Sequence, residues 1–163
     1  GAAERFARAR TVDELASLIT DAQLQGERAT ILGWGSNVLP ADAGVPGLTV
    51  VNLTRGLRVA RSGEVLADSG CSFQEVFLKT AQSRLHGLEF AVGIPGTLGG
   101  ALVSNAGAYR SCVSEFITRL EIVIEGERRW VDPSWMEFSY RDSVLRRADA
   151  PSSPRAATPW WMH

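Results

Sequence analysis

The chain has 163 residues, 45% of them apolar and 21% charged, with a formal net charge of −1. This composition fits one globular domain of ordinary size, or two small lobes that share a core. The near-neutral charge excludes the basic footprint of a nucleic-acid-binding protein, and no apolar run is long enough to cross a membrane.

Cysteine and histidine are too scarce for a disulfide scaffold or a metal centre. Cys71 and Cys112 form no Cys-x-x-Cys pair, and His86 and His163 lack the spacing of metal ligands. We expect two reduced thiols and no metal. Because no signal-peptide pattern is present, we expect a cytoplasmic protein, and we expect a monomer that binds neither nucleic acid nor membrane.

The first predicted helix follows a capping box formed by Thr11 and Glu14. Gly26 is its expected stop, and its buried face is marked by apolar residues at helical spacing: Leu15, Leu18, Ile19 and Ala22. A short apolar strand at residues 29–32 and a second strand at 48–53 complete a small α/β lobe.

The next predicted elements are two short strands within residues 57–69, with their turn at Ser62-Gly63. Ser72 and Glu75 resemble a second capping box, and the helix that follows is expected to stop at Gly87. Its buried face is predicted to consist of Phe73, Val76, Phe77 and Ala81.

The last predicted elements are a hairpin with strands at 120–124 and 128–132, followed by a helical turn at 133–138. The hairpin turns at Glu125-Gly126. From residue 148 the chain is rich in Pro, Ser and Ala, and it ends with Trp160-Trp161 near its terminus, so we interpret 148–163 as an irregular tail.

A glycine-rich bend, Gly33-Trp34-Gly35-Ser36-Asn37, follows the predicted strand at 29–32. A pyrophosphate needs several converging donors, and backbone N–H groups serve best where no Cβ intervenes. Two glycines in a tight turn also have a purely structural explanation. The bend is neither a Walker A loop, since no Gly-Lys-Ser/Thr follows, nor a dinucleotide G-x-G-x-x-G fingerprint.

A second glycine-rich segment, residues 93–109, is the stronger signal. Pro95 and its flanking glycines, Gly93 and Gly96, favour a sharp bend. Thr97 can bond to a phosphate or a ring carbonyl, and a flat ring system can lie against Gly99-Gly100. Asn105 and Gly107 could close the wall. A flexible surface loop is the alternative, but interleaved apolar residues favour burial: Ile94, Leu98, Leu102 and Val103. Together the two segments indicate a bound dinucleotide, and we expect a flavin.

The third feature is Tyr140-Arg141-Asp142-Ser143. An arginine beside an aromatic residue can clamp a carboxylate through two parallel N–H bonds. From the residues alone, a surface ion pair between Arg141 and Asp142 is the favoured explanation.

These three segments, in this order and at this spacing, resemble the UDP-N-acetylmuramate dehydrogenase family, also called UDP-N-acetylenolpyruvoylglucosamine reductases. The resemblance runs from residue 1 to about Arg147. It implies an α+β fold of the vanillyl-alcohol-oxidase (p-cresol methylhydroxylase) type, in which two lobes, at about 1–54 and 55–147, hold FAD between them.

The resemblance also implies roles for the motif residues. The backbone of Gly33, Trp34, Gly35, Ser36 and Asn37, together with that of Gly93, Ile94, Pro95, Gly96 and Thr97, would hold the FAD pyrophosphate and its neighbouring groups. Further residues would line the rest of the cofactor site: Gly99, Gly100, Asn105, Gly107 and Ala108. Tyr140 and Arg141 would bind substrate, and Arg141 matches the catalytic arginine that faces the enolpyruvyl carboxylate.

In that family NADPH reduces the flavin, which passes hydride to UDP-N-acetylglucosamine enolpyruvate, a step of peptidoglycan precursor synthesis. A serine assisted by a glutamate, both in a substrate domain, completes the reduction to UDP-N-acetylmuramate.

Three departures from the family pattern affect these expectations. The family begins with a further strand upstream, and its substrate domain follows Arg141, so we expect both parts to be missing here. No residue can therefore be assigned as the proton-donating serine or its glutamate. Arg110 also stands where the family pattern has glycine after Gly-Ala-Tyr.

Two alternatives stay open at this stage. One is a flavin- or nucleotide-binding module without catalytic activity. The other is a different flavin oxidoreductase of the same fold, although no His or Cys near the glycine segments is placed for covalent flavin attachment.

Overall fold

The computed structural model describes residues 1–148. The expected tail therefore lies, apart from its first residue, outside the described residues, and so do Trp160 and Trp161. Within 1–148 no helix has the length and apolar character needed to cross a bilayer. The same residues contain no group of three or more His, Cys, Asp or Glu side chains that could hold a metal ion.

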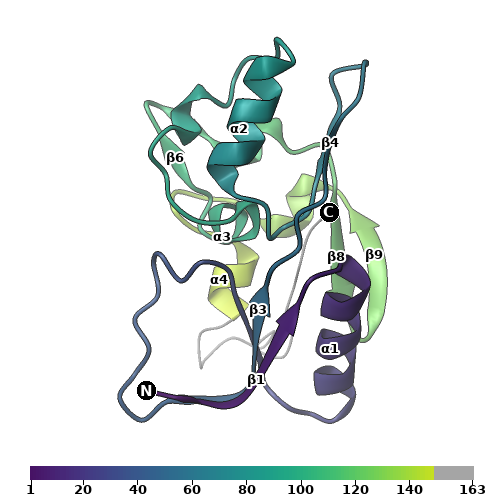
Figure 1. The fold of residues 1–163 in the computed structure, drawn as a ribbon, viewed down its shortest axis with the longest axis vertical. Helices are drawn as coiled ribbons and strands as arrows, with labels where there is room; N and C mark the ends of the chain where they lie inside the picture. The colour runs from purple at the N-terminus through teal and green to yellow at the C-terminus, as the bar shows by residue number, and fades with distance from the viewer. Residues whose placement is uncertain (149–163) are drawn as a thin grey trace.

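The first lobe is a three-stranded parallel sheet covered by one helix. Its strand order is β1-β3-β2, and α1 connects β1 to β2. The bounds are β1 Ala3–Ala9, α1 Val12–Leu24, β2 Ala29–Leu32 and β3 Val45–Asn52. Figure 1 shows this lobe at the bottom of the molecule, with α1 lying beside the strands.

Strand β1 was not predicted, because its side chains lack the alternation typical of a half-buried strand. Most of them are exposed, and only Ala9 is fully buried. Instead, β1 is held as a strand by its parallel backbone pairing with β3. Strand β3 also begins earlier than predicted: Val45 N–H donates to the Ala2 carbonyl, so the strand continues through Pro46-Gly47 with an irregular register.

Helix α1 forms as its capping box predicts. The Glu14 N–H donates to the Thr11 hydroxyl at 3.1 Å, and the Glu14 carboxylate accepts from the Thr11 N–H at 3.2 Å. The helix ends at Leu24, and Gly26 follows with a φ of 65°. Its apolar face packs on β3 in the first hydrophobic core.

The second lobe is made of short elements around a larger core. In chain order they are β4 Leu57–Val59, β5 Val65–Ala67, α2 Phe73–Gln82, the 3-10 turn η1 Glu89–Ala91, α3 Leu98–Val103, β6 Gly107–Ala108, β7 Ser111–Cys112, η2 Val113–Phe116, β8 Leu120–Ile124, β9 Glu127–Val131, η3 Pro133–Met136 and α4 Val144–Ala148. The strands form three antiparallel pairs: β4-β5, β6-β7 and β8-β9.

Two predictions about helices are corrected here. Helix α2 ends at Gln82 instead of running to Gly87, because Arg84 already takes a left-handed φ of 60°. Helix α3, inside the second glycine segment, was not predicted, since its two glycines lower helix propensity. The Thr97 side chain caps it, and packing of Leu98, Ala101 and Leu102 stabilises it.

The hairpin β8–β9 connects the two lobes. Val123, from β8, belongs to the first hydrophobic core, and the turn residue Gly126 bonds to side chains of α1. Figure 1 shows the hairpin lying along α1. The second lobe thus supplies part of the first lobe's core, while the boundary near residue 54 stays a prediction.

Candidate functional site

The two glycine-rich bends lie against each other. A Cβ placed on Gly33 would come within 3.0 Å of the Thr97 hydroxyl oxygen, closer than real Cβ atoms approach. The Ser36 hydroxyl donates to the Pro95 carbonyl at 3.3 Å. A Cβ on Gly96 would lie 2.9 Å from Ser36 Oγ. Segments far apart in the sequence therefore form one continuous surface poor in side chains.

The first bend, residues 33–37, leaves β2 and turns at once. Gly35 has a φ of 69°, a left-handed conformation that glycine adopts without strain, and its carbonyl accepts from Val38 N–H at 3.3 Å. The N–H groups of residues 34–37 donate to no group within residues 1–148. Ser36 and Asn37 are exposed. The bend thus presents consecutive backbone donors, the arrangement that binds an oxyanion.

The second bend, residues 93–97, is held by a bridge to the start of α2. Phe73 N–H donates to the Gly96 carbonyl at 3.0 Å, and Leu98 N–H donates to the Cys71 carbonyl at 2.8 Å. Gly96 and Thr97 are buried, yet their own N–H groups have no acceptor within the described chain. Since buried N–H groups are nearly always paired, this bend also fits an absent acceptor.

The glycines of the two segments serve two different purposes. At Gly35 a Cβ would meet only Leu32 Cδ1, at 3.9 Å, and at Gly93 it would meet nothing within 4 Å, so both face open space. At Gly99 it would lie 2.9 Å from the Ser69 Cβ, and at Gly107 it would overlap the Ser111 carbonyl. Gly99 and Gly107 are thus required by packing, whatever else they do.

Two predicted site residues already use their backbone N–H groups in hydrogen bonds within the protein. The Gly99 N–H donates to the Ser69 carbonyl at 2.8 Å, and the Gly100 N–H donates to the Thr97 hydroxyl at 3.3 Å. Gly99 and Gly100 therefore offer no free amide donors, and the expectation that a ring lies against them stays a prediction. Thr97 has a second role that we did not predict, as the cap of α3.

Asn105 joins the third motif to the second glycine segment. Its side chain is buried, its Nδ2 donates to the Ser139 carbonyl at 2.9 Å, and its Oδ1 accepts from the Ser114 N–H at 3.4 Å. The Ser143 hydroxyl adds a bond of 2.7 Å to the Val103 carbonyl. The second glycine segment therefore contacts both the first bend and the third motif. The anchoring role of Asn105 was not foreseen, because its partners lie far along the chain.

The ion pair between Arg141 and Asp142, favoured from the residues alone, is not found. Asp142 pairs with Arg147 instead, because α4 brings Arg147 back beside it. Arg141 lies in a turn closed by the bridge between Ser139 and Asp142, with a φ of 54°. Tyr140 is 91% exposed, and Arg141 is exposed as well. The Arg141 guanidinium is thus available to an incoming carboxylate.

Cys71 supports the second bend through its backbone and not through thiol chemistry. Burial, reinforced by the negative charge of Asp68, raises the pKa of the Cys71 thiol to about 11. Its Sγ lies 3.1 Å from the Gly56 carbonyl. A thiol that stays protonated at neutral pH is a poor nucleophile, so Cys71 is a structural residue.

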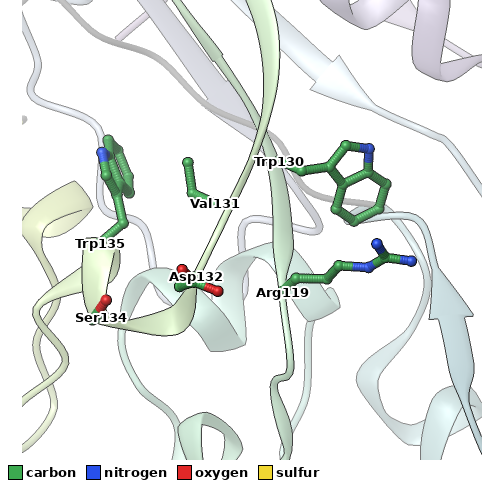
Figure 2. Close-up of a pocket in the computed structure, with 6 residues that line it drawn as sticks. All are labelled: Arg119, Trp130, Val131, Asp132, Ser134 and Trp135. Atoms are coloured by element: carbon green, nitrogen blue, oxygen red, sulfur yellow. The ribbon is translucent and has the colours of Figure 1, made fainter.

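Two hollows of the described surface lie away from the glycine bends. One, of about 510 Å³, is lined by residues of β9 and η3 together with Arg119, which stacks on Trp130 at 4.7 Å. Figure 2 shows the indoles of Trp130 and Trp135 on opposite sides of the backbone that runs between them. The other, of about 820 Å³, is a mainly apolar groove between β5, α2 and β8. Neither hollow is formed by the glycine bends.

Comparison with known proteins agrees with this geometry. The model of a family described as "FAD binding domain" matches residues 3–130. The chain is similar to UDP-N-acetylenolpyruvoylglucosamine reductases: it is 40% identical over 147 residues to that of Rubrobacter xylanophilus, covering 89% of this chain and 49% of the relative. It is 36% identical over 151 residues to that of Trichormus variabilis, covering 90% and 45%.

A solved structure shows the same fold. The reductase from Thermus caldophilus superposes with a TM-score of 0.70 at 24% identity, covering 96% of this chain and 53% of that one. The predicted α+β fold of the vanillyl-alcohol-oxidase type is confirmed. The chain spans about half the length of the curated relatives it matches.

Proposed function

The chain belongs to the family of FAD-binding domains, and on that premise we propose that it is the flavin-binding part of a UDP-N-acetylenolpyruvoylglucosamine reductase. The reaction proposed is the NADPH-dependent reduction of UDP-N-acetylglucosamine enolpyruvate to UDP-N-acetylmuramate. Its support is the similarity to reductases at 36–40% identity, combined with a site that suits the cofactor.

The observation that carries the proposal is the meeting of the two bends. The exposed or partly exposed residues 34–37 lie next to a bend in which the buried residues Gly96 and Thr97 carry N–H groups without an acceptor in residues 1–148. A diphosphate offers several acceptor oxygens and two negative charges, so it would satisfy these donors together. Open space at Gly35 and Gly93 leaves room for it. The residues present therefore fit FAD.

The remaining motif residues would position the reacting groups. Bound FAD would supply the chemistry of hydride transfer, which no side chain can perform. Gly99, Gly100, Gly107 and Ala108 would line the ring system. The Arg141 guanidinium would hold the enolpyruvyl carboxylate through charge-assisted bonds and stabilise the negative charge that develops beside it. Tyr140 would pack against the same substrate.

A binding module without turnover is the second candidate. It is favoured by the family match over residues 3–130, whose description names FAD binding and no reaction. The two candidates share the cofactor and differ in catalysis. Turnover of NADPH with the enolpyruvyl substrate by the purified chain eliminates the module, whereas FAD binding without turnover supports it.

The test of the cofactor site is a titration of the purified chain with FAD, followed by visible absorbance and flavin fluorescence. Gly35→Asp places a carboxylate in the open space of the first bend, where it repels a diphosphate. Gly26→Asp is the matched control, because Gly26 also has a left-handed φ and open surroundings but lies at the end of α1. We expect FAD affinity to fall at least tenfold in Gly35→Asp and to stay unchanged in Gly26→Asp. If Gly35→Asp and Gly26→Asp bind FAD with equal affinity, the proposed cofactor site at the two bends is contradicted.

The test of the substrate site is Arg141→Ala. Loss of a charge-assisted contact typically weakens binding by about tenfold or more. We expect this loss when the enolpyruvyl substrate is titrated into the FAD-loaded protein, with FAD affinity unchanged. Unaltered substrate affinity would remove Arg141 from the proposal.

A further inference from the structure

The sequence Tyr-Arg occurs twice, and each copy lies at the tip of a tight turn. Tyr109-Arg110 forms the two-residue turn between β6 and β7, and Tyr140-Arg141 lies in the turn from Ser139 to Asp142. The two tyrosines are among the most exposed large side chains described, at 88% and 91%. Both arginines are exposed as well.

The same buried amide anchors both turns. Asn105 Nδ2 donates to the carbonyl of Ser139, where the second turn begins. Its Oδ1 accepts from Ser114 N–H, just after β7, and Asn105 itself lies just before β6. The two Tyr-Arg tips therefore extend from one fixed point, next to the second glycine segment.

Neither arginine is neutralised by the acidic residue nearest to it in the chain. The Glu115 carboxylate accepts from the Ser111 hydroxyl at 2.8 Å and from the Cys112 N–H at 3.2 Å, and these bonds lower the pKa of Glu115. Asp142 pairs with Arg147. Within residues 1–148 neither Arg110 nor Arg141 has an ion-pair partner, so both guanidinium charges face solvent.

The backbone at Arg110 favours another residue. Tyr109 and Arg110 have φ values of 54° and 70°, the pattern of a type I′ turn, which prefers glycine, asparagine or aspartate at both positions. A side chain in this conformation is strained relative to glycine. Arg110 thus places a cationic side chain at a position where glycine would fit without strain.

We propose that Arg110 is a second anion-binding residue of this site, which binds the diphosphate of an incoming nucleotide while Arg141 holds a carboxylate. This inference rests on the proposed function for the identity of the nucleotide. Two sources could present that diphosphate: the nucleotide sugar, or the nicotinamide dinucleotide that reduces the flavin. Arg110 would thereby select substrates that carry two separated anionic groups.

The experiment compares Arg110→Gly with the unaltered protein, both loaded with FAD, in titrations with UDP and with NADP⁺ at low ionic strength. Arg84→Gly is the matched control: Arg84 is also an exposed arginine with a left-handed φ of 60°, but it follows α2 and belongs to neither Tyr-Arg turn. Both variants relieve backbone strain, so the midpoint of thermal unfolding should rise by about 2–4 °C in each.

Only Arg110→Gly should weaken the binding of UDP or NADP⁺, by about tenfold. Added salt should reduce this difference in affinity between Arg110→Gly and the unaltered protein. The probe that loses affinity identifies the source of the diphosphate. Failure of the unaltered protein to bind either probe, or equal affinities in Arg110→Gly and the unaltered protein, overturns the inference. If no variant takes up FAD, the proposed function fails instead, and the same titrations of the FAD-free protein still test Arg110.

Discussion

Gly33 and Thr97 approach so closely that no side chain fits between them. A Cβ on Gly33 would overlap the Thr97 hydroxyl, which at the same time caps α3. The end of β2 and the start of α3 are thereby locked together, and the two glycine bends face one shared space. The proposed cofactor site depends on this contact between the lobes.

Gly33→Ala tests that contact. The added methyl group must displace Thr97, and we expect a loss of stability of about 1–3 kcal/mol, typical of overpacking. FAD affinity should fall as well, because the bends move apart. Thermal unfolding and an FAD titration measure the two effects. Gly26→Ala, a substitution in open surroundings away from the bends, should leave FAD affinity unchanged.

Two substitutions at Asn105 can separate the stability contributed by its side-chain hydrogen bonds from the cost of its strained backbone. Asn105→Gly removes the part-buried bonds to Ser139 and Ser114 but keeps the φ of 42° without strain, and the loss of these two bonds should cost about 1–3 kcal/mol. Asn105→Ala adds strain of about 1–2 kcal/mol. Chemical denaturation should rank Asn105→Ala below Asn105→Gly, and both below the unaltered protein. A fully stable Asn105→Gly would remove Asn105 as the anchor of the third motif.

Arg128 connects the hairpin β8–β9 to α1. Its guanidinium makes two bonds of 3.0 Å to Glu121 and one of 2.7 Å to Asp13, whereas the adjacent Arg129 pairs with Glu127 on its own strand. We expect Arg128→Ala to lower the free energy of unfolding by about 1 kcal/mol, since solvent screens its pair with the exposed Asp13, and Arg129→Ala to leave it nearly unchanged. Equal unfolding midpoints for the two variants would show that Arg128 does not connect the lobes.

The stability of the protein should fall at high pH because of Cys71. Its pKa is raised from 9.0 to about 11, so between these values the unfolded chain releases a proton that the folded chain keeps. The contribution of this thiol is present below pH 9 and should be lost at up to about 1.4 kcal/mol per pH unit as the pH rises toward 11. Cys71→Ala should show a flatter profile. Denaturant unfolding at pH 8, 9, 10 and 11 gives the comparison.

Thiol labelling provides a second check on Cys71. Cys71 is buried and Cys112 is half-buried. At pH 8 an alkylating reagent should modify Cys112 first in the folded protein and reach Cys71 only after unfolding. Peptide mapping identifies the labelled residue, and early modification of Cys71 would contradict its assignment as a structural thiol.

The sequence by itself determined those features that depend on neighbouring residues. The capping box at Thr11, strand β2, the cap of α2 at Ser72 and the hairpin at Glu125-Gly126 all follow from short-range hydrogen bonds and side-chain periodicity. The three motifs were also visible, because each needs a local composition of unusual residue types: glycine without side chains, or arginine beside tyrosine.

The tertiary structure decided everything that depends on partners distant in the chain. Strand β1 exists through its ladder with β3, and α3 exists in spite of its glycines because Thr97 caps it and the second core packs on it. Only folding shows that Gly99 and Gly107 are required by packing, that Asp142 pairs with Arg147, and that Gly33 meets Thr97. Such contacts have no local signal, since their energy comes from burial and hydrogen bonding between segments that only the complete fold brings together.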